Sequence, residues 1–373
     1  MTKVGSRAEE RLDELRRHLR RKAGWDDPLK VRPYRGYGNR HRLWLTGRVL
    51  EDRGIDEPEL GESTLENVHR MLRRYASREQ PGARLKAVYG RHEVEVACDD
   101  EGYFELDLDL EEGSDDGFDE RWRPVDLELL EPLRDGQEPF CTQGQVLVPP
   151  EEAELCVVSD VDDTIVQTGA TDLQRHVLTV LLNSARTRTA FPGVGAFYRA
   201  LERGMDDRPV NPIFYVSSSP WNLYDLFEGF LELREIPPGP MFLKDFGLEP
   251  GKLFKSGHGE HKVRRVETLM DAYPDLAFVL IGDSGQEDAE IYREVVRRRP
   301  ERVEAVYLRD VSKDLRDEEV REIIAEIEDH GVAAVFAEDT RDAAADAVER
   351  GLIHPETLDE IDREAREDEE EEG

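Results

Sequence analysis

The sequence contains few cysteines, few lysines and no long hydrophobic run. Cys98, Cys141 and Cys156 are far apart and form no CxxC pair, which argues against a disulfide framework and against a zinc site. The longest apolar runs, such as residues 276–281, have the length of a strand, far below the roughly 20 residues that a membrane-spanning helix needs. No apolar signal-peptide core follows the N-terminus. We therefore expect a soluble, cytoplasmic protein.

Acidic residues far outnumber basic ones. The chain has 85 acidic and 51 basic residues, a formal net charge of -34, and only nine of the basic residues are lysine. Such a surface repels nucleic acid and anionic bilayers at low salt, so we expect no nucleic-acid partner. One interpretation is a halophilic source, where dissolved salt screens the repulsion between dense carboxylates. On that interpretation the charge says little about a substrate.

Changes in composition divide the chain into four regions. Residues 1–30 are basic, and Leu12, Leu15 and Leu19 fall at helical spacing, which predicts an amphipathic helix. Its apolar stripe either packs on the next domain or anchors the chain at a membrane surface. We expect residues 31–150 to form a β-rich, sandwich-like accessory domain and residues 151–357 to form an α/β domain. We expect residues 358–373 to be an acidic disordered tail. A helix is expected at 65–75.

Strands of the first domain are expected where short alternating or aromatic-rich segments lie between turns, at 42–50, 86–89, 93–97 and 103–110. In the second domain, apolar runs alternate with helical patterns. These runs are residues 155–159, 213–217, 241–243, 277–281, 303–308 and 332–336. This alternation is typical of a Rossmann-like parallel sheet with helices on both faces.

Polar groups follow three of these runs directly. The first run leads into Asp160-Val161-Asp162-Asp163-Thr164, the second ends at Ser217, and the fourth leads into Gly282-Asp283, with Asp288 shortly after. Ligands of an open parallel sheet bind at the carboxyl ends of its strands. Four carboxylates gathered there repel one another unless a hard cation lies between them, so the sequence predicts Mg²⁺. A carboxylate neutralised in this way can attack phosphorus.

Asp160-x-Asp162-x-Thr164 resembles the first motif of the haloacid dehalogenase superfamily of phosphohydrolases. The later motifs follow in the order of that superfamily. Ser217 resembles the hydroxyl of the second motif, Lys262 the lysine of the third, and Asp283 with Asp288 the GDxxxxD pattern of the fourth. Over residues 155–310 the sequence is more specifically similar to the catalytic domain of actin-patch-type phosphatidate phosphatases. A Tyr-x-Gly-Tyr-Gly segment, residues 34–38, also fits bacterial members of that family, but its role does not follow from the sequence.

The resemblance implies a haloacid-dehalogenase-type fold for the α/β domain and a role for each motif residue. Asp160 would be the nucleophile and a Mg²⁺ ligand, while Asp162 would act as general acid and base and bind the metal through its carbonyl. Thr164 would brace the loop, and Ser217 and Lys262 would contact the phosphoryl oxygens. Asp283 and Asp288 would complete the metal shell. Lys255 is the alternative to Lys262.

The substrate is a phosphate monoester on this interpretation, and phosphatidate at a membrane surface follows from the resemblance alone. Two alternatives stay open. The chain is a phosphatase of a soluble phosphomonoester, or it is an inert adaptor whose β-rich domain binds a partner. The sequence does not indicate an oligomeric state.

Overall fold

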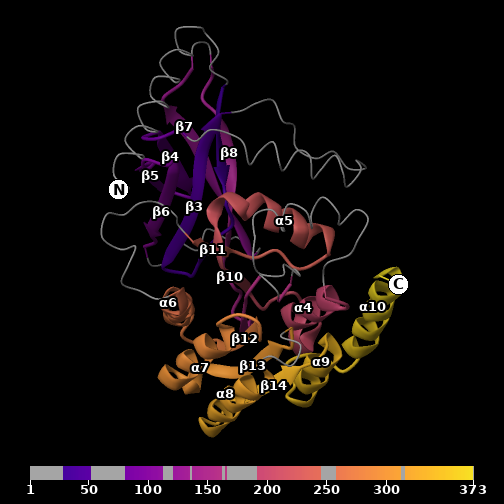
Figure 1. The fold of residues 1–373 in the computed structure, drawn as a ribbon. Coiled ribbons are helices and arrows are strands. Elements are labelled where there is room, and N and C mark those ends of the chain that lie inside the picture. Colours follow the sequence, from indigo (N-terminus) through magenta and orange to yellow (C-terminus); the bar gives the residue numbers. More distant parts are fainter. Residues whose placement is uncertain are drawn as a thin grey trace, which may run out of the picture.

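The computed structural model describes residues 28–51, 80–111, 121–134, 137–161, 164–165, 191–244, 258–311 and 316–372 of the chain. The predicted helix at 65–75 and nearly all of the predicted helix within 1–30 lie outside these residues. The described chain forms two sheets, one of eight strands and one of six. Figure 1 shows the first sheet above the helices that surround the second.

The first sheet contains only strands from the N-terminal part of the chain. They are β1 (Leu29–Pro33), β2 (Gly36–Gly38), β3 (Arg42–Glu51), β4 (Arg84–Tyr89), β5 (His92–Ala97), β6 (Tyr103–Asp109), β7 (Trp122–Glu131) and β8 (Cys141–Leu147). Their order is β1-β3-β2-β8-β7-β4-β5, with β6 paired to β3. Pairing is antiparallel except between β2 and β8.

The predicted strands coincide with β3, β4, β5 and β6 to within two residues. Strands β1, β2, β7 and β8 were not predicted, because these segments carry Pro33, Pro124, glycines or several adjacent polar residues that weaken the period-two pattern. The sandwich-like arrangement stays a prediction.

The second sheet is parallel throughout. Its strands are β9 (Leu155–Ser159), β10 (Ile213–Pro220), β11 (Met241–Lys244), β12 (Ala277–Asp283), β13 (Val303–Arg309) and β14 (Ala333–Ala337), in the order β11-β10-β9-β12-β13-β14. All five residues of β9 are buried, as expected for a central strand covered on both faces. The prediction of a mixed α/β architecture with a parallel sheet is confirmed.

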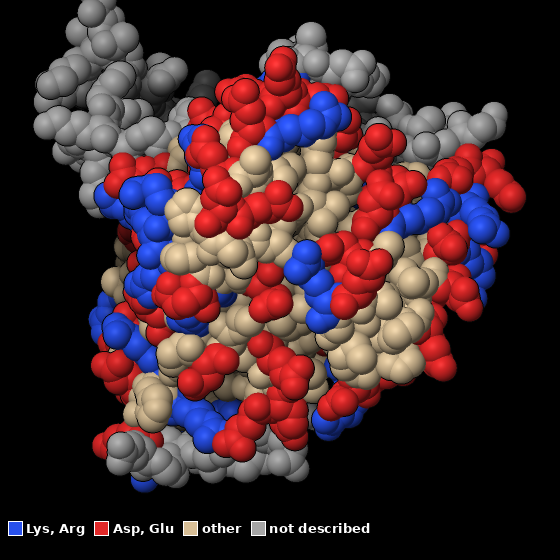
Figure 2. Space-filling view, turned by 90° about the horizontal axis from the view of Figure 1, so that it is seen from below, with Lys and Arg blue, Asp and Glu red and all other residues tan. Residues whose placement is uncertain are grey.

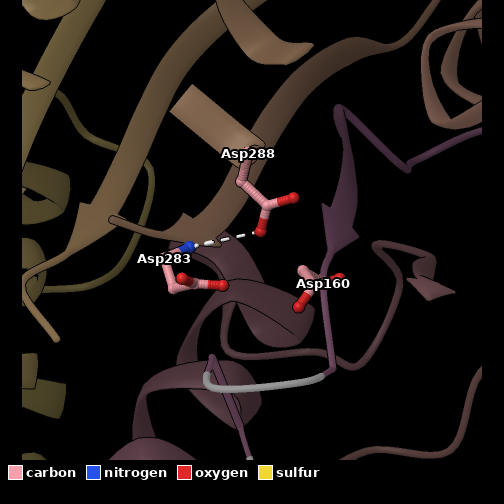
Figure 3. A group of neighbouring side chains, drawn as sticks. All are labelled: Asp160, Asp283 and Asp288. Atoms are coloured by element: carbon pink, nitrogen blue, oxygen red, sulfur yellow. Dashed lines mark hydrogen bonds between the residues drawn. The ribbon is translucent and has the colours of Figure 1, made fainter. Parts of the chain in front are cut away.

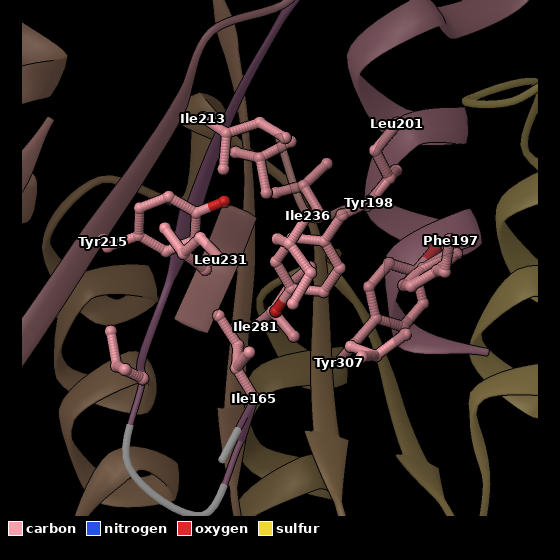
Figure 4. Close-up of a cluster of buried hydrophobic side chains, with 14 of the residues drawn as sticks. Ile165, Phe197, Tyr198, Leu201, Ile213, Tyr215, Leu231, Ile236, Ile281 and Tyr307 are labelled. Carbon is pink, nitrogen blue, oxygen red and sulfur yellow. The ribbon is translucent and has the colours of Figure 1, made fainter. Parts of the chain in front are cut away.

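Helices cover both faces of the parallel sheet and form two hydrophobic clusters. The helices are α4 (Val194–Arg203), α5 (Tyr224–Leu233), α6 (His258–Ala272), α7 (Asp288–Arg298), α8 (Asp317–Asp329), α9 (Thr340–Glu349) and α10 (Thr357–Glu372). One cluster joins the sheet to α4, α5, α9 and α10, and the other joins it to α6, α7 and α8. Figure 4 shows the first cluster, where Phe197 of α4 packs edge-on against Tyr307 of β13 (6.0 Å between ring centroids).

Helix α10 replaces the predicted disordered tail. Ile361 and Ala365, four residues apart, are each 1 % exposed; Ile361 belongs to the first cluster, and Ala365 lies against Gly193 at the start of α4. Several α10 carboxylates bind neighbouring basic groups or backbone, as Glu364 does with Arg199 (2.5 Å) and with the N–H of Ala196 (2.8 Å) near the start of α4. The prediction of disorder was wrong because it rested on the acidic composition, whereas the helix buries an apolar stripe of only one residue per turn.

Acidic and basic side chains alternate over the surface seen in Figure 2. Glu294 illustrates the local pairing. Arg297 and Arg298 donate hydrogen bonds to it and hold the pKa of this carboxyl at about 2. Within the described ranges, no helix combines the length and the hydropathy required to cross a bilayer.

Candidate active site

Asp160 follows β9 at the centre of the parallel sheet. Its backbone N–H donates to the carbonyl of Ile281 on β12 (2.9 Å), which extends the sheet pairing by one residue, and its side chain is buried. The hydroxyl of Ser159 donates to the Asp160 carbonyl (2.6 Å) and lies 2.6 Å from the hydroxyl oxygen of Tyr198. The backbone at Asp160 is therefore held from both sides.

Asp283 and Asp288 stand at the end of the neighbouring strand β12. Asp283 Oδ1 accepts hydrogen bonds from the N–H groups of Gly285 (2.6 Å) and Gln286 (2.8 Å), so it braces its own loop. Asp288 opens α7, and its Oδ2 accepts from the N–H of Asp283 (3.3 Å; Figure 3). A Cβ at Gly282 would lie 2.8 Å from the Asp288 carboxylate, so this close approach requires glycine.

The three carboxylates converge. One oxygen of each of Asp160, Asp283 and Asp288 lies within 4.8 Å of the others, and all three side chains are at most 1 % exposed (Figure 3). Like charges at this separation destabilise one another strongly in a dry environment. The cluster therefore requires a compensating cation.

Lys262 supplies one positive charge. It projects from α6, and its Nζ lies 2.6 Å from Asp160 Oδ1 and 2.6 Å from Asp288 Oδ1. Burial by itself lowers the pKa of Lys262, but the two carboxylates outweigh that effect and hold the pKa well above its usual range. Lys262 is thus a permanent cation of the cluster. Lys255 lies outside the described residues.

The remaining predicted residues lie at the same edge of the sheet or outside the described part. Ser217 is on β10, two residues beyond the pair that joins Tyr215 to Ser159, and its Oγ accepts a hydrogen bond from the Ser219 N–H (2.9 Å). Thr164 is buried four residues after Asp160. Asp162 lies outside the described residues, so its predicted role stays a prediction.

Several side chains that surround the cluster were not predicted from the sequence. Tyr198 reaches Ser159, and the Tyr292 hydroxyl donates to the carbonyl of Ile281 (2.7 Å). Burial raises the pKa of both phenols, with Asp288 and Asp160 adding to the effect at Tyr292, so both stay protonated donors. Arg316 donates to the carbonyls of Ser284 and Gln286 in the Asp283 loop. No local pattern marks Tyr198 or Arg316, because each lies far along the chain from the residues that it contacts, whereas Tyr292 lies one helical turn after Asp288 on α7.

The donors of the cluster fit a hard divalent cation. All three acidic groups offer carboxylate oxygens, the ligand type that Mg²⁺ prefers, and no described histidine or cysteine belongs to the group. Asp160, Asp283 and Asp288 are the residues that could hold the ion.

The same part of the chain is similar to known proteins. Residues 155–310 match the family model described as "Phosphatidate phosphatase APP1, catalytic domain". The phosphatidate phosphatase APP1 of Saccharomyces cerevisiae is 29% identical over 161 residues, which cover 43% of this chain and 27% of that protein. An uncharacterized protein of Schizosaccharomyces pombe is 29% identical over 163 residues, covering 43% of this chain and 26% of that protein.

The similarity to solved structures is weak. A minor pilin, PilB of Streptococcus sanguinis, aligns with 77% of this chain and 87% of its own at 9% sequence identity, but the TM-score is 0.28. That score supports no argument. The two curated relatives are matched over only about a quarter of their own length. Residues 155–310, which contain the whole carboxylate cluster, are thus related to the catalytic domain of a family of phosphoric monoester hydrolases.

Proposed function

We propose that the chain is a Mg²⁺-dependent phosphatase that transfers a phosphoryl group from a phosphate monoester to Asp160 and then to water. The observation that carries the proposal is the buried cluster of Asp160, Asp283 and Asp288 around Lys262, at the carboxyl edge of a parallel sheet. Such a site, inside the segment related to phosphatase catalytic domains, favours phosphoryl transfer over other hydrolytic chemistry.

In the first step, a carboxylate oxygen of Asp160 forms a bond to phosphorus while the bond from phosphorus to the ester oxygen breaks. The leaving alcohol takes its proton from Asp162, the general acid implied by the resemblance. In the second step, Asp162 removes a proton from water, the water oxygen bonds to phosphorus, and the bond to Asp160 breaks. Inorganic phosphate leaves, and both carboxyl groups return to their starting state.

The described residues orient the nucleophile and neutralise charge. Lys262 fixes one oxygen of Asp160 and stays protonated throughout, so it can also attract the phosphoryl oxygens. Ser217, on the adjacent strand, offers a hydroxyl to the same oxygens. Mg²⁺, held by Asp160, Asp283 and Asp288, would supply the further positive charge that offsets repulsion between the nucleophile and the phosphate.

Phosphatidate is the substrate that we propose, because the matched family and the yeast relative carry that activity in their descriptions. Because phosphatidate is a membrane lipid, a cytoplasmic enzyme that hydrolyses it would have to bind at a membrane surface. The alternative is a soluble phosphomonoester, which needs the same chemistry and no lipid contact.

The test is phosphate release from phosphatidate vesicles and from soluble phosphomonoesters, each with Mg²⁺ and with EDTA. Wild type is compared with Asp160→Asn, and Asp275→Asn is the control. Asp275 is an exposed carboxylate just before β12, at the opposite end of the sheet. We expect Asp160→Asn to lose activity by about 10³-fold or more, as nucleophiles do, and Asp275→Asn to keep it.

Release of phosphate that requires Mg²⁺ and Asp160 supports the mechanism. Turnover of phosphatidate selects the lipid substrate, and turnover of soluble esters alone discards it. Full activity in Asp160→Asn would refute the mechanism, while no release from any substrate would put the adaptor hypothesis first.

A further inference from the structure

We infer that residues 34–38 of the first sheet position the turn that follows Ser217, so that the N-terminal strands are part of the catalytic unit. We call these residues the strap. The inference rests on the proposed function for its kinetic consequence, but the contacts that support it are independent of that function. They come from the packing of the strap on β3, on two aromatic clusters and on α5.

The two glycines of the strap allow β2 to lie directly against β3. A Cβ at Gly36 would collide with the carbonyl oxygen of Trp44, and a Cβ at Gly38 would lie 2.5 Å from Leu43 Cδ2. Any other residue at these positions would push β2 away from its neighbour. The glycines of the motif are thus explained by packing within the first sheet.

The two tyrosines of the strap extend from the first sheet into the parallel-sheet domain. Tyr34 is 2 % exposed and belongs to the cluster that covers α4 and α5, where its ring stacks on Trp221 (5.0 Å between centroids, 8° between planes) and packs on Tyr224 (4.1 Å). Tyr37 enters the opposite cluster and meets Phe242 of β11 edge-on (5.2 Å). The strap therefore contacts both faces of the parallel sheet at its β10–β11 edge.

Polar contacts fix the same arrangement. The N–H of Arg35 donates to the hydroxyl of Tyr224 (2.8 Å), and the hydroxyl of Tyr273 donates to the carbonyl of Gly38 (3.1 Å). Next to the strap, Arg32 pairs with Asp225 (3.1 Å) and Glu228 (2.5 Å), both on α5. In Figure 1, α5 accordingly lies beside the strands of the first sheet.

Ser217 and the strap are linked through one short turn. Strand β10 ends at Pro220, Trp221 begins a single 3₁₀ turn, and Tyr224 begins α5. Only three residues separate Ser217 from Trp221, and within them the Ser219 N–H is bonded to the Ser217 hydroxyl oxygen (2.9 Å). Because Tyr34 packs on both Trp221 and Tyr224, it restricts the turn that orients Ser217. Tyr34 is a positioning residue.

The ring of Tyr34 makes these contacts, whereas its hydroxyl has no hydrogen-bond partner among the described residues. Tyr34→Phe should therefore behave as wild type, and Tyr34→Leu should loosen the turn. The matched control is Phe104→Leu. Phe104 is an aromatic residue of the same sheet with 1 % exposure, and it packs in a separate cluster within that sheet.

Two measurements are made at a temperature where circular dichroism shows all variants folded. The first is kcat and KM for phosphate release. Tyr34→Leu should lower kcat by about 10- to 100-fold, the cost of a misplaced catalytic group, with Tyr34→Phe and Phe104→Leu near wild type. The second is hydrogen exchange of residues 217–223, where exchange at Ser219 should accelerate in Tyr34→Leu alone.

Faster exchange together with lower kcat supports the inference. Unchanged exchange in folded Tyr34→Leu, or equal effects of Phe104→Leu, would overturn it. If wild type releases no phosphate, the proposed function fails, and the exchange measurement still decides whether the strap positions the turn.

Discussion

The ammonium nitrogen of Lys262 lies 2.6 Å from Asp160 Oδ1, although the two residues are 102 positions apart in the chain. The contact joins the first turns of α6 to the end of the central strand β9. In this contact the ammonium group of Lys262 offsets part of the negative charge of Asp160, the buried residue proposed as nucleophile, before substrate or metal binds. The cluster should therefore depend on Lys262 for stability as well as for catalysis.

Replacement of Lys262 by Met should lower the free energy of unfolding by about 3 kcal/mol near pH 8, because two buried carboxylates lose their cation. Urea unfolding with EDTA present measures the change. Lys86→Met is the control, since Lys86 pairs with Glu93 at the surface of β4 and should affect stability little. Equal stability of Lys262→Met and wild type would mean that Lys262 does not compensate the cluster.

Binding of Mg²⁺ should raise the melting temperature of wild type and should do so much less in Asp283→Asn. A ligand at 100 times its dissociation constant stabilises the folded state by about 2.7 kcal/mol. The Asp283 oxygens belong to the three-carboxylate group, whereas Asp275→Asn leaves the group intact and should retain the full response. Differential scanning calorimetry with Mg²⁺ and with EDTA makes the comparison, and an undiminished Mg²⁺ response in Asp283→Asn would place the ion elsewhere.

Stability should increase from low salt to molar KCl. The formal net charge of -34 makes the folded chain repel itself, and the screening length falls to about 3 Å at 1 M. Thermal unfolding in EDTA at increasing KCl tests this, with sucrose as the uncharged solute for comparison. A flat or falling melting temperature would remove the argument for a halophilic source.

Thiol labelling of the native protein at pH 8 should modify Cys141 alone. Cys141 is exposed, whereas Cys98 and Cys156 are buried. Burial raises the pKa of Cys98 to about 12 and that of Cys156 well above its usual range, so both stay protonated and unreactive. Mass spectrometry after iodoacetamide treatment identifies the labelled thiols, and all three should react in urea. Rapid labelling of native Cys156 would contradict the buried position of β9.

The sequence by itself was sufficient for the parallel sheet and for most of the carboxylate cluster. Strands such as β9 and β12 are continuous apolar runs, and the polar residues that follow them lie at one edge of the sheet because parallel strands all end there. This rule places the acidic segments that contain Asp160, Asp283 and Asp288 at one edge, and the family resemblance implied which of their carboxylates form the site. Their meeting at one site needs no knowledge of side-chain packing.

Only the tertiary structure decided which distant groups complete the site. Lys262 stands in a charged helical stretch, where the residue pattern cannot separate a buried cation from a solvated one. The family resemblance implied its place in the site, and the structure shows its contacts with Asp160 and Asp288. Tyr198 carries no local signal. Helix α10 shows the same limit, since its composition predicts disorder while Ile361 and Ala365 pack on α4 and α9. The reason is physical: periodicity reports which face of an element is buried, but the partner on that face is chosen by long-range packing.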